Sequence, residues 1–354
     1  ENRRSLMAYL NYVVLPLEIM TFFFAFLSDA MKFNPAIRKA AFFLLSALWV
    51  IATVSRPWGV SPDDWNYSFH LVLSDPFSKS GFEDAMGHSF LYYQALAIVR
   101  DFTDTEAAFL IIAGVALALK LWLIGRITSY SLMSLFAYVS IFWMLHDVVQ
   151  LRAAVASLLL ILAIHLYSSG RKTPALASMV AAPMVHIQGA VVPIGIGLRW
   201  LFAEKFVLAI GVVLFTQALV SVGVAPSKAI FAFIPIESER ALATLEDSEG
   251  GSGLRLTTLV MVAGLALAIP GLRSWRSAAM DLAFYTVIGG FLVYWLTAGV
   301  GGVSNRLMQF LWVPIVLLAP YYKRNFFTYF GFILICLAYF YLSGWINQLM
   351  GHAG

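Results

Sequence analysis

The chain has 354 residues, of which 61% are hydrophobic and only 12% are charged. A soluble globular domain carries about 25% charged residues, so this composition excludes an ordinary soluble protein. The net charge of +4 is spread over short loops, which indicates an orientation in a membrane rather than nucleic-acid binding. The single cysteine, Cys336, excludes an internal disulfide and a cysteine metal site. We therefore expect a polytopic integral membrane protein.

The apolar residues occur in repeated runs, and a helix of about 20 such residues is long enough to cross a bilayer. Helix is expected for every run, because lipid offers the backbone no other hydrogen-bond partner. The chain shows no internal repeat and no soluble domain, so we expect one transmembrane domain over residues 1–354. Its twelve predicted spans cover residues 6–28, 40–55, 106–125, 129–146, 150–168, 173–185, 188–201, 206–224, 257–272, 279–298, 305–320 and 325–346. The predicted fold class is therefore all-α, with about 12 transmembrane helices.

The segment Gly87–Phe102 is apolar but short for a span, and its placement decides the sides of all later loops. If it stays on one side as an interfacial or re-entrant helix, the basic clusters share one face, as the positive-inside rule requires. These clusters are Lys32/Arg38/Lys39, Arg126, Arg171/Lys172, Arg199/Lys205, Arg273/Arg276 and Lys323/Arg324. We therefore predict that both termini lie outside, with an outer loop at 56–105 that carries the re-entrant helix. Lys120 and His165 are expected near the inner face, with their charged ends in water.

The stretch His146–Arg152 places a histidine, an aspartate, a glutamine and an arginine between two apolar runs. Arg152 begins the next predicted helix, where a cation opposes the helix dipole. Holding such a charge at the bilayer centre costs about 2.5–3.5 kcal/mol. We therefore expect an anion close to Arg152. The alternative is that the arginine reaches water or pairs with a local carboxylate such as Asp147.

Two further arginines, Arg255 and Arg306, share this position at the outer ends of predicted helices. Free backbone N–H groups at a helix N-terminus, combined with an arginine fork, form an anion site suited to phosphate. Ser304 and Asn305 are good N-cap residues for the last of these helices. Arg255 ends an outer loop at 225–256 that is long for a compact protein, so we expect this loop to act as a lid. The alternative is that each arginine is paired locally or reaches water.

Asp63 and Asp64 follow Pro62 and are followed by two aromatic residues, Trp65 and Tyr67. A carboxylate pair of this kind serves as a general base, as a pair of metal ligands or as a solvated turn. The aromatic neighbours favour contact with a sugar, because such rings cover the apolar faces of sugars. We therefore expect this segment to touch a glycan.

Two ionisable residues interrupt apolar stretches, and each has two interpretations. His186 is either a catalytic group or a histidine that ends a helix or packs in the core. Glu18 lies inside the first predicted span, so it is either a functional group or the partner of a neighbouring helix. The sequence contains no P-loop, no GxSxG motif and no His/Cys cluster with zinc spacing. We therefore predict no ATP-driven transport, no metal site and no cofactor.

Five motifs, taken in order, resemble the EpsG family of Wzy-like polysaccharide polymerases. They are PDDWNY at 62–67, Gln-Leu-Arg-x-x-x-Ala at 150–156, Gly-Arg-Lys at 170–172, Ala-x-x-x-x-His at 181–186 and Ser-Asn-Arg at 304–306. The resemblance covers most of the chain, from about residue 7 to about residue 325. The chain departs from the family pattern at Ser61-Pro62-Asp63, where Gly-Thr-Asp is usual, and at His186-Ile187-Gln188, where His-x-Ser is usual.

The resemblance implies a GT-C-like membrane glycosyltransferase of the bacterial inner membrane, with its active site facing the periplasm. It would join O-antigen or exopolysaccharide repeat units, using one glycan on undecaprenyl pyrophosphate as donor and another as acceptor. A membrane protein that regulates chain length is an expected partner, and nucleic acid is not. The expected catalytic residues are Asp63 as base, Arg152 and Arg306 together on one pyrophosphate, and His186. The expected substrate-binding residues are Arg56, Asp64, Tyr67, Asp147, Gln150, Arg240, Arg255 and Asn305.

Two other functions are compatible with the sequence. An O-antigen ligase uses the same kind of donor but transfers the glycan to a lipid A core. A transporter moves lipid-linked glycan without changing it covalently. A ladder of longer glycans, a glycan on lipid A core, or no covalent product distinguishes the three functions.

Overall fold

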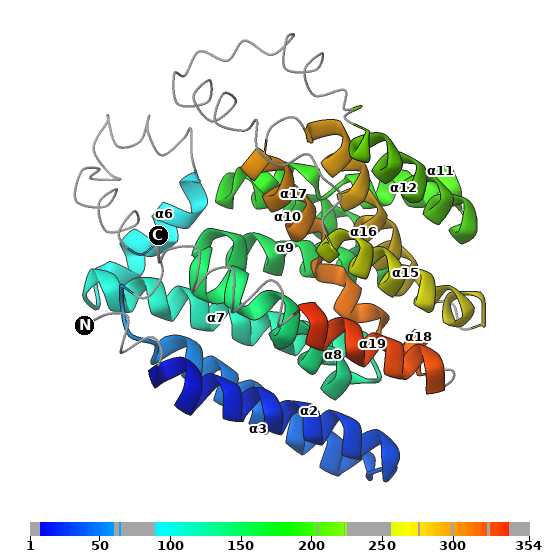
Figure 1. Ribbon diagram of the computed structural model, residues 1–354. Coiled ribbons are helices and arrows are strands. Elements are labelled where there is room, and N and C mark those ends of the chain that lie inside the picture. The colour runs from blue at the N-terminus through cyan, green and yellow to red at the C-terminus, as the bar shows by residue number, and fades with distance from the viewer. Residues whose placement is uncertain are drawn as a thin grey trace. The chain divides into compact units, whose positions relative to one another are not determined.

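The structure of the chain is a computed structural model (Figure 1). It describes residues 8–59, 64, 89–203, 205–222, 224, 256–274, 277–298, 301–323 and 326–339, without the side chains of 187–188, 256–257 and 301–306. The described secondary structure is helical throughout, which confirms the all-α prediction. The chain divides into two compact units: the first is Glu1–Ala190 with Ser343–Gly354, and the second is Val191–Leu342. The predicted single transmembrane domain and GT-C-like architecture stay predictions.

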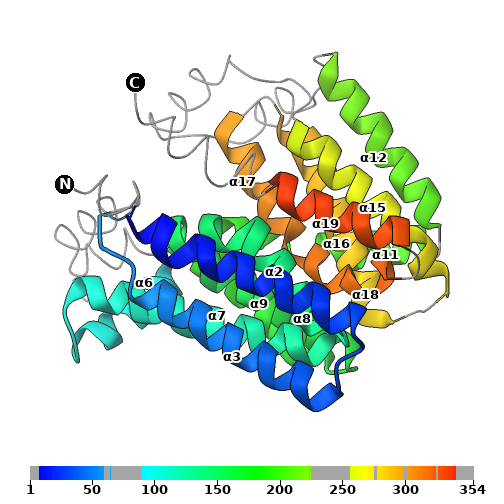
Figure 2. The same cartoon turned by 60° about the horizontal axis from the view of Figure 1, so that its bottom comes forward.

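The first unit begins with two antiparallel helices that pack side by side in both ribbon views (Figures 1 and 2). One consists of a π-helical turn, η1 (Leu10–Val14), and α2 (Leu15–Ala30); the other is α3 (Pro35–Val54). Asn34 caps α3, because its side chain accepts a hydrogen bond from the Ala36 N–H at 2.9 Å. The helices that follow are α6 (Phe90–Arg100), α7 (Thr105–Ile127), α8 (Ser131–Tyr138), the π-helix η2 (Val139–Val149), α9 (Leu151–Ser168), α10 (Lys172–Val185) and the 3-10 turn η3 (Ile187–Val191), which reaches the unit boundary.

The core of the first unit lies between α2, α3 and the continuous helix formed by α8 and η2. The indole rings of Trp49 and Trp143 meet edge to face, with centroids 4.6 Å apart, and both are fully buried. Each indole N–H donates to a threonine hydroxyl, Trp49 to Thr21 at 3.0 Å and Trp143 to Thr53 at 2.8 Å. Satisfying these N–H groups lets two large rings be buried without an unpaired donor. The contacts fix η2 against both N-terminal helices.

The second unit is organised around one buried helix, α16 (Ala278–Thr297), of which most residues are inaccessible. Small residues let its neighbours approach: a Cβ on Gly195 would lie 2.9 Å from the Cα of Thr286. The remaining helices are α11 (Ile194–Phe202), α12 (Phe206–Ser221), α15 (Leu256–Ser274), α17 (Gly301–Trp312), the 3-10 segment η5 (Val313–Leu318), α18 (Ala319–Tyr322) and α19 (Phe326–Tyr339).

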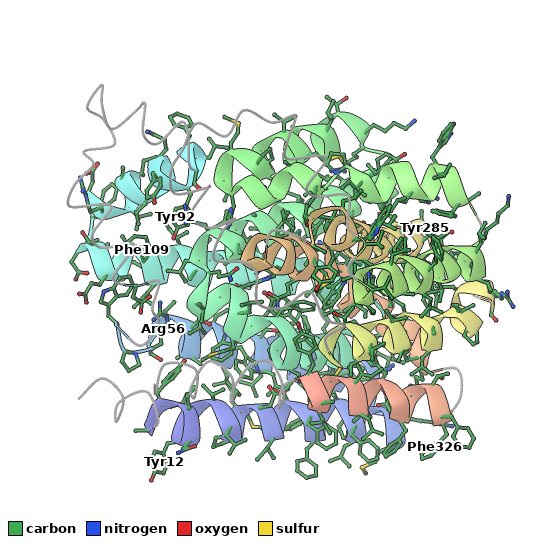
Figure 3. All side chains as sticks on the ribbon, turned by 45° about the horizontal axis from the view of Figure 1, so that its top comes forward. Tyr12, Arg56, Tyr92, Phe109, Tyr285 and Phe326 are labelled. Atoms are coloured by element: carbon green, nitrogen blue, oxygen red, sulfur yellow. The ribbon has the colours of Figure 1, made fainter. Side chains whose placement is uncertain are left out.

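In the part of the chain that the structure describes, six helices are long and apolar enough to cross a membrane: Leu10–Ala30, Pro35–Val54, Thr105–Ile127, Ser131–Val149, Leu151–Ser168 and Ala278–Thr297. Shorter apolar helices are Gly189–Phe202, Phe206–Ser221, Thr258–Ser274, Leu307–Tyr322 and Phe326–Tyr339. Each unit also exposes large apolar side chains, such as Tyr12 at 82% and Phe326 at 71% (Figure 3). Such surfaces are expected where helices face lipid. Together these features indicate a multi-pass membrane protein.

Each of the twelve predicted spans overlaps a described helix, but several helices are shorter than predicted. The predicted span at 173–185 is a helix of 14 residues, and that at 188–201 is divided between η3 and the nine-residue α11. The number of spans therefore stays a prediction. Helix α6, with 11 residues, is too short to cross a bilayer, as the interfacial or re-entrant interpretation of this segment requires.

Candidate functional site

The stretch His146–Arg152 forms the end of one helix and the start of the next, as the sequence predicts. The π-helix η2 ends at Val149, and Gln150 leaves the helical conformation with φ −105° and ψ 73°. The Gln150 N–H still donates to the carbonyl of Leu145 at 2.8 Å, while its own carbonyl accepts from the Ala154 N–H at 3.1 Å. Helix α9 begins at Leu151, so Arg152 lies in its first turn.

Arg152 lies at the N-termini of two helices. Its Nη1 donates to the hydroxyl of Ser89 at 3.3 Å, and Ser89 is the residue that precedes α6. The first turns of both α6 and α9 present backbone N–H groups and a partial positive charge. A guanidinium at this point adds a full positive charge to two helix ends, which is an arrangement suited to an anion.

Tyr93, in the first turn of α6, completes this environment. Burial raises the pKa of Tyr93, and the positive charge of Arg152 lowers it in part. The hydroxyl therefore keeps its proton at neutral pH and can donate a hydrogen bond. Arg152, Ser89 and Tyr93 together offer donors and positive charge to one place.

Arg56 and Asp64, both predicted to bind substrate, form a buried ion pair with each other. The two guanidinium nitrogens Nη1 and Nη2 each lie 2.7 Å from a carboxylate oxygen of Asp64, and the Gly59 N–H donates to the same carboxylate at 3.0 Å. The guanidinium also stacks over Trp58 at 5.5 Å, and Trp58 stacks on Phe109 at 5.4 Å. The solvated-turn alternative is therefore wrong for Asp64. Figure 3 shows Arg56 and Phe109 at the same end of the unit.

Asp147 binds Lys120 and Tyr138 rather than Arg152. Lys120 Nζ lies 2.9 Å from Asp147 Oδ1 and 2.6 Å from the Tyr138 hydroxyl, which itself donates to the other carboxylate oxygen. Lys120 and Asp147 are both fully buried. The expectation that Lys120 reaches water near the inner face is wrong, and so is the alternative that Asp147 pairs with Arg152. A role for Asp147 in substrate binding stays a prediction.

The spacing of apolar residues in α7 predicts that Lys120 is buried. Ala113, Leu117 and Ile124 are spaced three or four residues from one another or from Lys120, and all three are buried. This spacing places the lysine on the inward face of the helix. Its carboxylate partner is 27 residues away in the sequence, so the pairing itself had no local signal.

His186 ends a helix, as one of its two interpretations predicted. The helix α10 stops at Val185, and the backbone of His186 is extended, with φ −155° and ψ 131°. Its electrostatic neighbours include His146, which is 1% exposed and packs its ring at 5.7 Å from that of Phe142. The sequence patterns assigned no role to His146, although it lies in the stretch His146–Arg152. The catalytic role of His186 stays a prediction.

Glu18 is the partner of a neighbouring helix, as its alternative interpretation predicted. Its carboxylate accepts a hydrogen bond from the hydroxyl of Ser140 in η2. Ser140 also donates to the carbonyl of Phe136 at 2.8 Å, so its hydroxyl is shared between two acceptors. Glu18 is only 4% exposed. The contact joins α2 to the π-helical segment.

The other predicted site residues lie in the second unit or outside the described residues. Asn305 and Arg306 belong to α17, which begins at Gly301, so the prediction that Ser304 and Asn305 cap the helix is wrong. Packing of α17 against α16 outweighs the low helix propensity of its two first glycines. Arg255 directly precedes α15, and it falls outside the described residues together with Asp63, Tyr67 and Arg240. The expectation that Arg152 and Arg306 bind one pyrophosphate stays a prediction.

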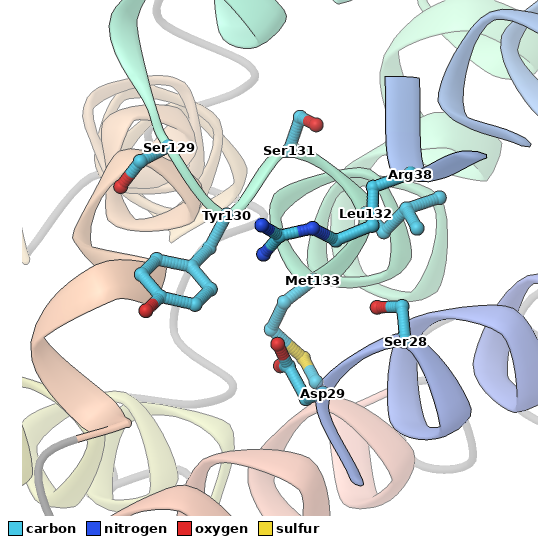
Figure 4. Close-up of a pocket in the computed structure, with 8 residues that line it drawn as sticks. All are labelled: Ser28, Asp29, Arg38, Ser129, Tyr130, Ser131, Leu132 and Met133. Carbon is cyan, nitrogen blue, oxygen red and sulfur yellow. The ribbon is translucent and has the colours of Figure 1, made fainter. Parts of the chain in front are cut away.

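A pocket opens at the opposite end of the helix formed by α8 and η2. Figure 4 shows the side chain of Arg38 pointing into it beside the start of α8. It is lined by Ser28, Asp29, Arg38, Ser129, Tyr130, Ser131, Leu132 and Met133, and none of the predicted site residues is among them. Among the described residues, no group of three or more His, Cys, Asp and Glu side chains could hold a metal ion. The candidate site is therefore the group formed by Arg152, Ser89 and Tyr93, which we call the anion-attracting group.

The comparison with known protein families matches the EpsG family over residues 40–352. No curated protein and no solved structure matches the chain. Because the family match covers most of its length, this chain belongs to the EpsG family, which suggests a part in exopolysaccharide biosynthesis.

Proposed function

We propose that this protein is a polymerase that joins oligosaccharide repeat units carried on undecaprenyl pyrophosphate. The reaction takes place at the periplasmic face of the inner membrane, with one lipid-linked glycan as donor and another as acceptor. Membership of the EpsG family supports a role in exopolysaccharide biosynthesis, and the multi-pass helical fold supports a lipid-linked substrate. A membrane protein that regulates chain length is a further partner in this proposal.

The observation that carries the proposal is the position of Arg152. Its guanidinium bonds Ser89 at the start of α6 while it lies in the first turn of α9, so three sources of positive potential coincide. An arginine–phosphate contact contributes about 1.5–3 kcal/mol net, because both groups are charged and the fork is bidentate. A pyrophosphate at the membrane surface fits this place in charge and in hydrogen-bonding capacity.

The proposed reaction requires little chemistry from the protein. The bond between the anomeric carbon and the pyrophosphate oxygen breaks, and a bond from an acceptor hydroxyl oxygen to the same carbon forms. Arg152 stabilises the charge that develops on the departing pyrophosphate. The hydroxyl proton passes to a base, for which Asp63 is our first candidate and His186 the second. A positioned base contributes about 10²–10⁴ in rate.

The test is a single-component assay with purified protein in liposomes and synthetic lipid-linked repeat unit. A ladder of longer lipid-linked glycans supports the proposal. Addition of lipid A core to the same reaction detects a ligase, which would transfer glycan to it without making a ladder. Movement of unchanged glycan across the bilayer, with no covalent product, would identify a transporter and exclude the proposed polymerase.

A further inference from the structure

Lys120, Tyr138 and Asp147 form a polar triad inside the helices of the first unit. Each of the three makes a hydrogen bond to the other two, and all three are fully buried. An ionisable pair at membrane depth is expected to have a functional role, because its burial is costly and apolar residues would fill the same space. None of the three residues belongs to the anion-attracting group at Arg152.

The triad depends on the π-helical form of η2. Tyr138 and Asp147 are nine residues apart. In an α-helix of 3.6 residues per turn, nine residues make about two and a half turns, which puts the two side chains on opposite faces. The i→i+5 hydrogen bonds of a π-helix widen each turn, so nine residues make roughly two turns and the side chains return to one face. The bonds within the triad and the wide helix therefore support each other.

Two further contacts hold the same segment. Ser140 donates to Glu18 of α2, and Trp143 donates to Thr53 of α3 at 2.8 Å. Three neighbouring helices therefore each fix one side chain of η2. A π-helix of 11 residues is unusual, because π-helices occur mostly as single turns, frequently at functional sites.

We infer that Lys120 and Asp147 are positioning residues for Arg152. Asp147 lies in the last turn of η2, and the chain leaves η2 at Gln150 to enter α9. If the 11 residues of η2 relaxed to an α-helix, the residues after them would rotate by about half a turn. The buried ion pair prevents this rotation and thereby sets where Arg152 is presented. The inference rests on the proposed function, because it assigns the ion pair to the pyrophosphate site.

The decisive variant is Lys120→Met/Asp147→Leu, because it removes both charges and leaves none unpaired. Replacing a buried ion pair by apolar residues of similar size is often neutral or stabilising. We expect the thermal unfolding temperature to fall by only a few degrees, because the Tyr138 hydroxyl loses its two partners but no charge is left unpaired. In contrast, kcat/KM for the lipid-linked donor should fall at least about tenfold, since a misplacement of about 1 Å can cost about a hundredfold. Gln217→Leu is the matched control, because Gln217 is also buried and polar but lies in the second unit.

A second readout does not depend on enzymatic activity. Phenylglyoxal modifies arginine side chains, and peptide mass spectrometry gives the rate at Arg152 in the resting protein. We expect this rate to change at least severalfold in the double variant while the rate at the exposed Arg171 stays the same. If the double variant does not fold, Tyr138→Phe keeps the ion pair and removes only the tyrosine hydroxyl. Its expected effects on both readouts have the same direction and are smaller.

The outcomes separate this inference from the proposed function. Wild-type activity and wild-type Arg152 reactivity in the double variant would show that the ion pair only holds the fold. If the wild type itself extends no glycan, the polymerase proposal fails, and the phenylglyoxal rates still decide whether the ion pair positions Arg152. A changed Arg152 rate together with lost chain extension supports both.

Discussion

Among the described residues of the first unit, two ion pairs are equally buried but connect different parts of the chain. In both the Arg56–Asp64 pair and the Lys120–Asp147 pair, the side chains have 0% exposure, with closest contacts of 2.7 Å and 2.9 Å. The first pair closes over eight residues just after α3. The second joins α7 to η2 across 27 residues. The Arg56–Asp64 pair, here the local pair, therefore joins two points of one short stretch. The Lys120–Asp147 pair, here the distant pair, fixes the register of one helix against another.

The partners around each ion pair sharpen the contrast. Arg56 and Asp64 are supported by the Gly59 N–H and by the Trp58 ring, which are also near them in the sequence. These supports come from the same short stretch of chain, and the Trp58 ring in turn stacks on Phe109 of α7. Lys120 and Asp147 depend on Tyr138, which reaches them only because η2 is π-helical. Breaking the distant pair should therefore lower the stability of the protein more than breaking the local pair.

The largest expected effect follows removal of one partner of the distant pair. Lys120→Met leaves the carboxylate of Asp147 buried without its cation, which costs about 3–5 kcal/mol. We expect a large fall in the thermal unfolding temperature in detergent and in the yield of monodisperse protein. Lys120→Met/Asp147→Leu should recover most of the loss. A single variant as stable as the wild type would mean that water or another group satisfies Asp147.

Removing the cation of the local pair should cost less stability than removing the cation of the distant pair. In Arg56→Met, Asp64 keeps the bond from the Gly59 N–H, just as Asp147 in Lys120→Met keeps the bond from the Tyr138 hydroxyl. The smaller expected loss comes from the short stretch of chain that the Arg56–Asp64 pair closes, because the Lys120–Asp147 pair joins two helices across 27 residues. We expect a loss of about 1.5–3 kcal/mol, with faster chymotrypsin cleavage within residues 60–88 as its local sign. Equal losses of unfolding temperature in Arg56→Met and Lys120→Met would remove the distinction between the two ion pairs.

Substitution of a third cation, Arg152, should reduce activity rather than stability, unlike substitution of Arg56 or Lys120. Lysine keeps the charge but loses the bidentate fork, so Arg152→Lys is expected to reduce chain extension at least about tenfold, which corresponds to about 1.4 kcal/mol. In the absence of substrate, the thermal unfolding temperature of Arg152→Lys should stay close to that of the wild type. Undecaprenyl pyrophosphate should raise the unfolding temperature of the wild type more than that of the variant. Full activity in Arg152→Lys would show that Arg152, like Arg56 and Lys120, holds the fold and does not bind the pyrophosphate.

The sequence predicted the helices and the position of Arg152 well, because apolar runs and a charge at a helix start are local signals. For Glu18 it offered pairing with a neighbouring helix as one of two interpretations, since an ionisable group at that depth requires a partner or a function. It did not predict the triad, because an α-helical period places Tyr138 and Asp147 on opposite faces. It also misplaced the start of α17, where packing on α16 overrides two glycines. Long-range contacts and a changed helix period leave no local pattern to detect.

The smallest expected effect concerns Glu18, which also touches η2 but belongs to no ion pair among the described residues. In Glu18→Leu, Ser140 loses one acceptor and keeps the Phe136 carbonyl at 2.8 Å, so no donor is left unsatisfied. We therefore expect the free energy of unfolding to fall by about 0.5–1.5 kcal/mol, the range for a typical single hydrogen bond. Chain extension should remain near the wild-type rate, because the triad still holds the π-helix. A loss of activity as large as in Lys120→Met/Asp147→Leu would show that the helix register is set jointly by all the contacts to η2. In that case the difference between the two ion pairs would be one of location alone.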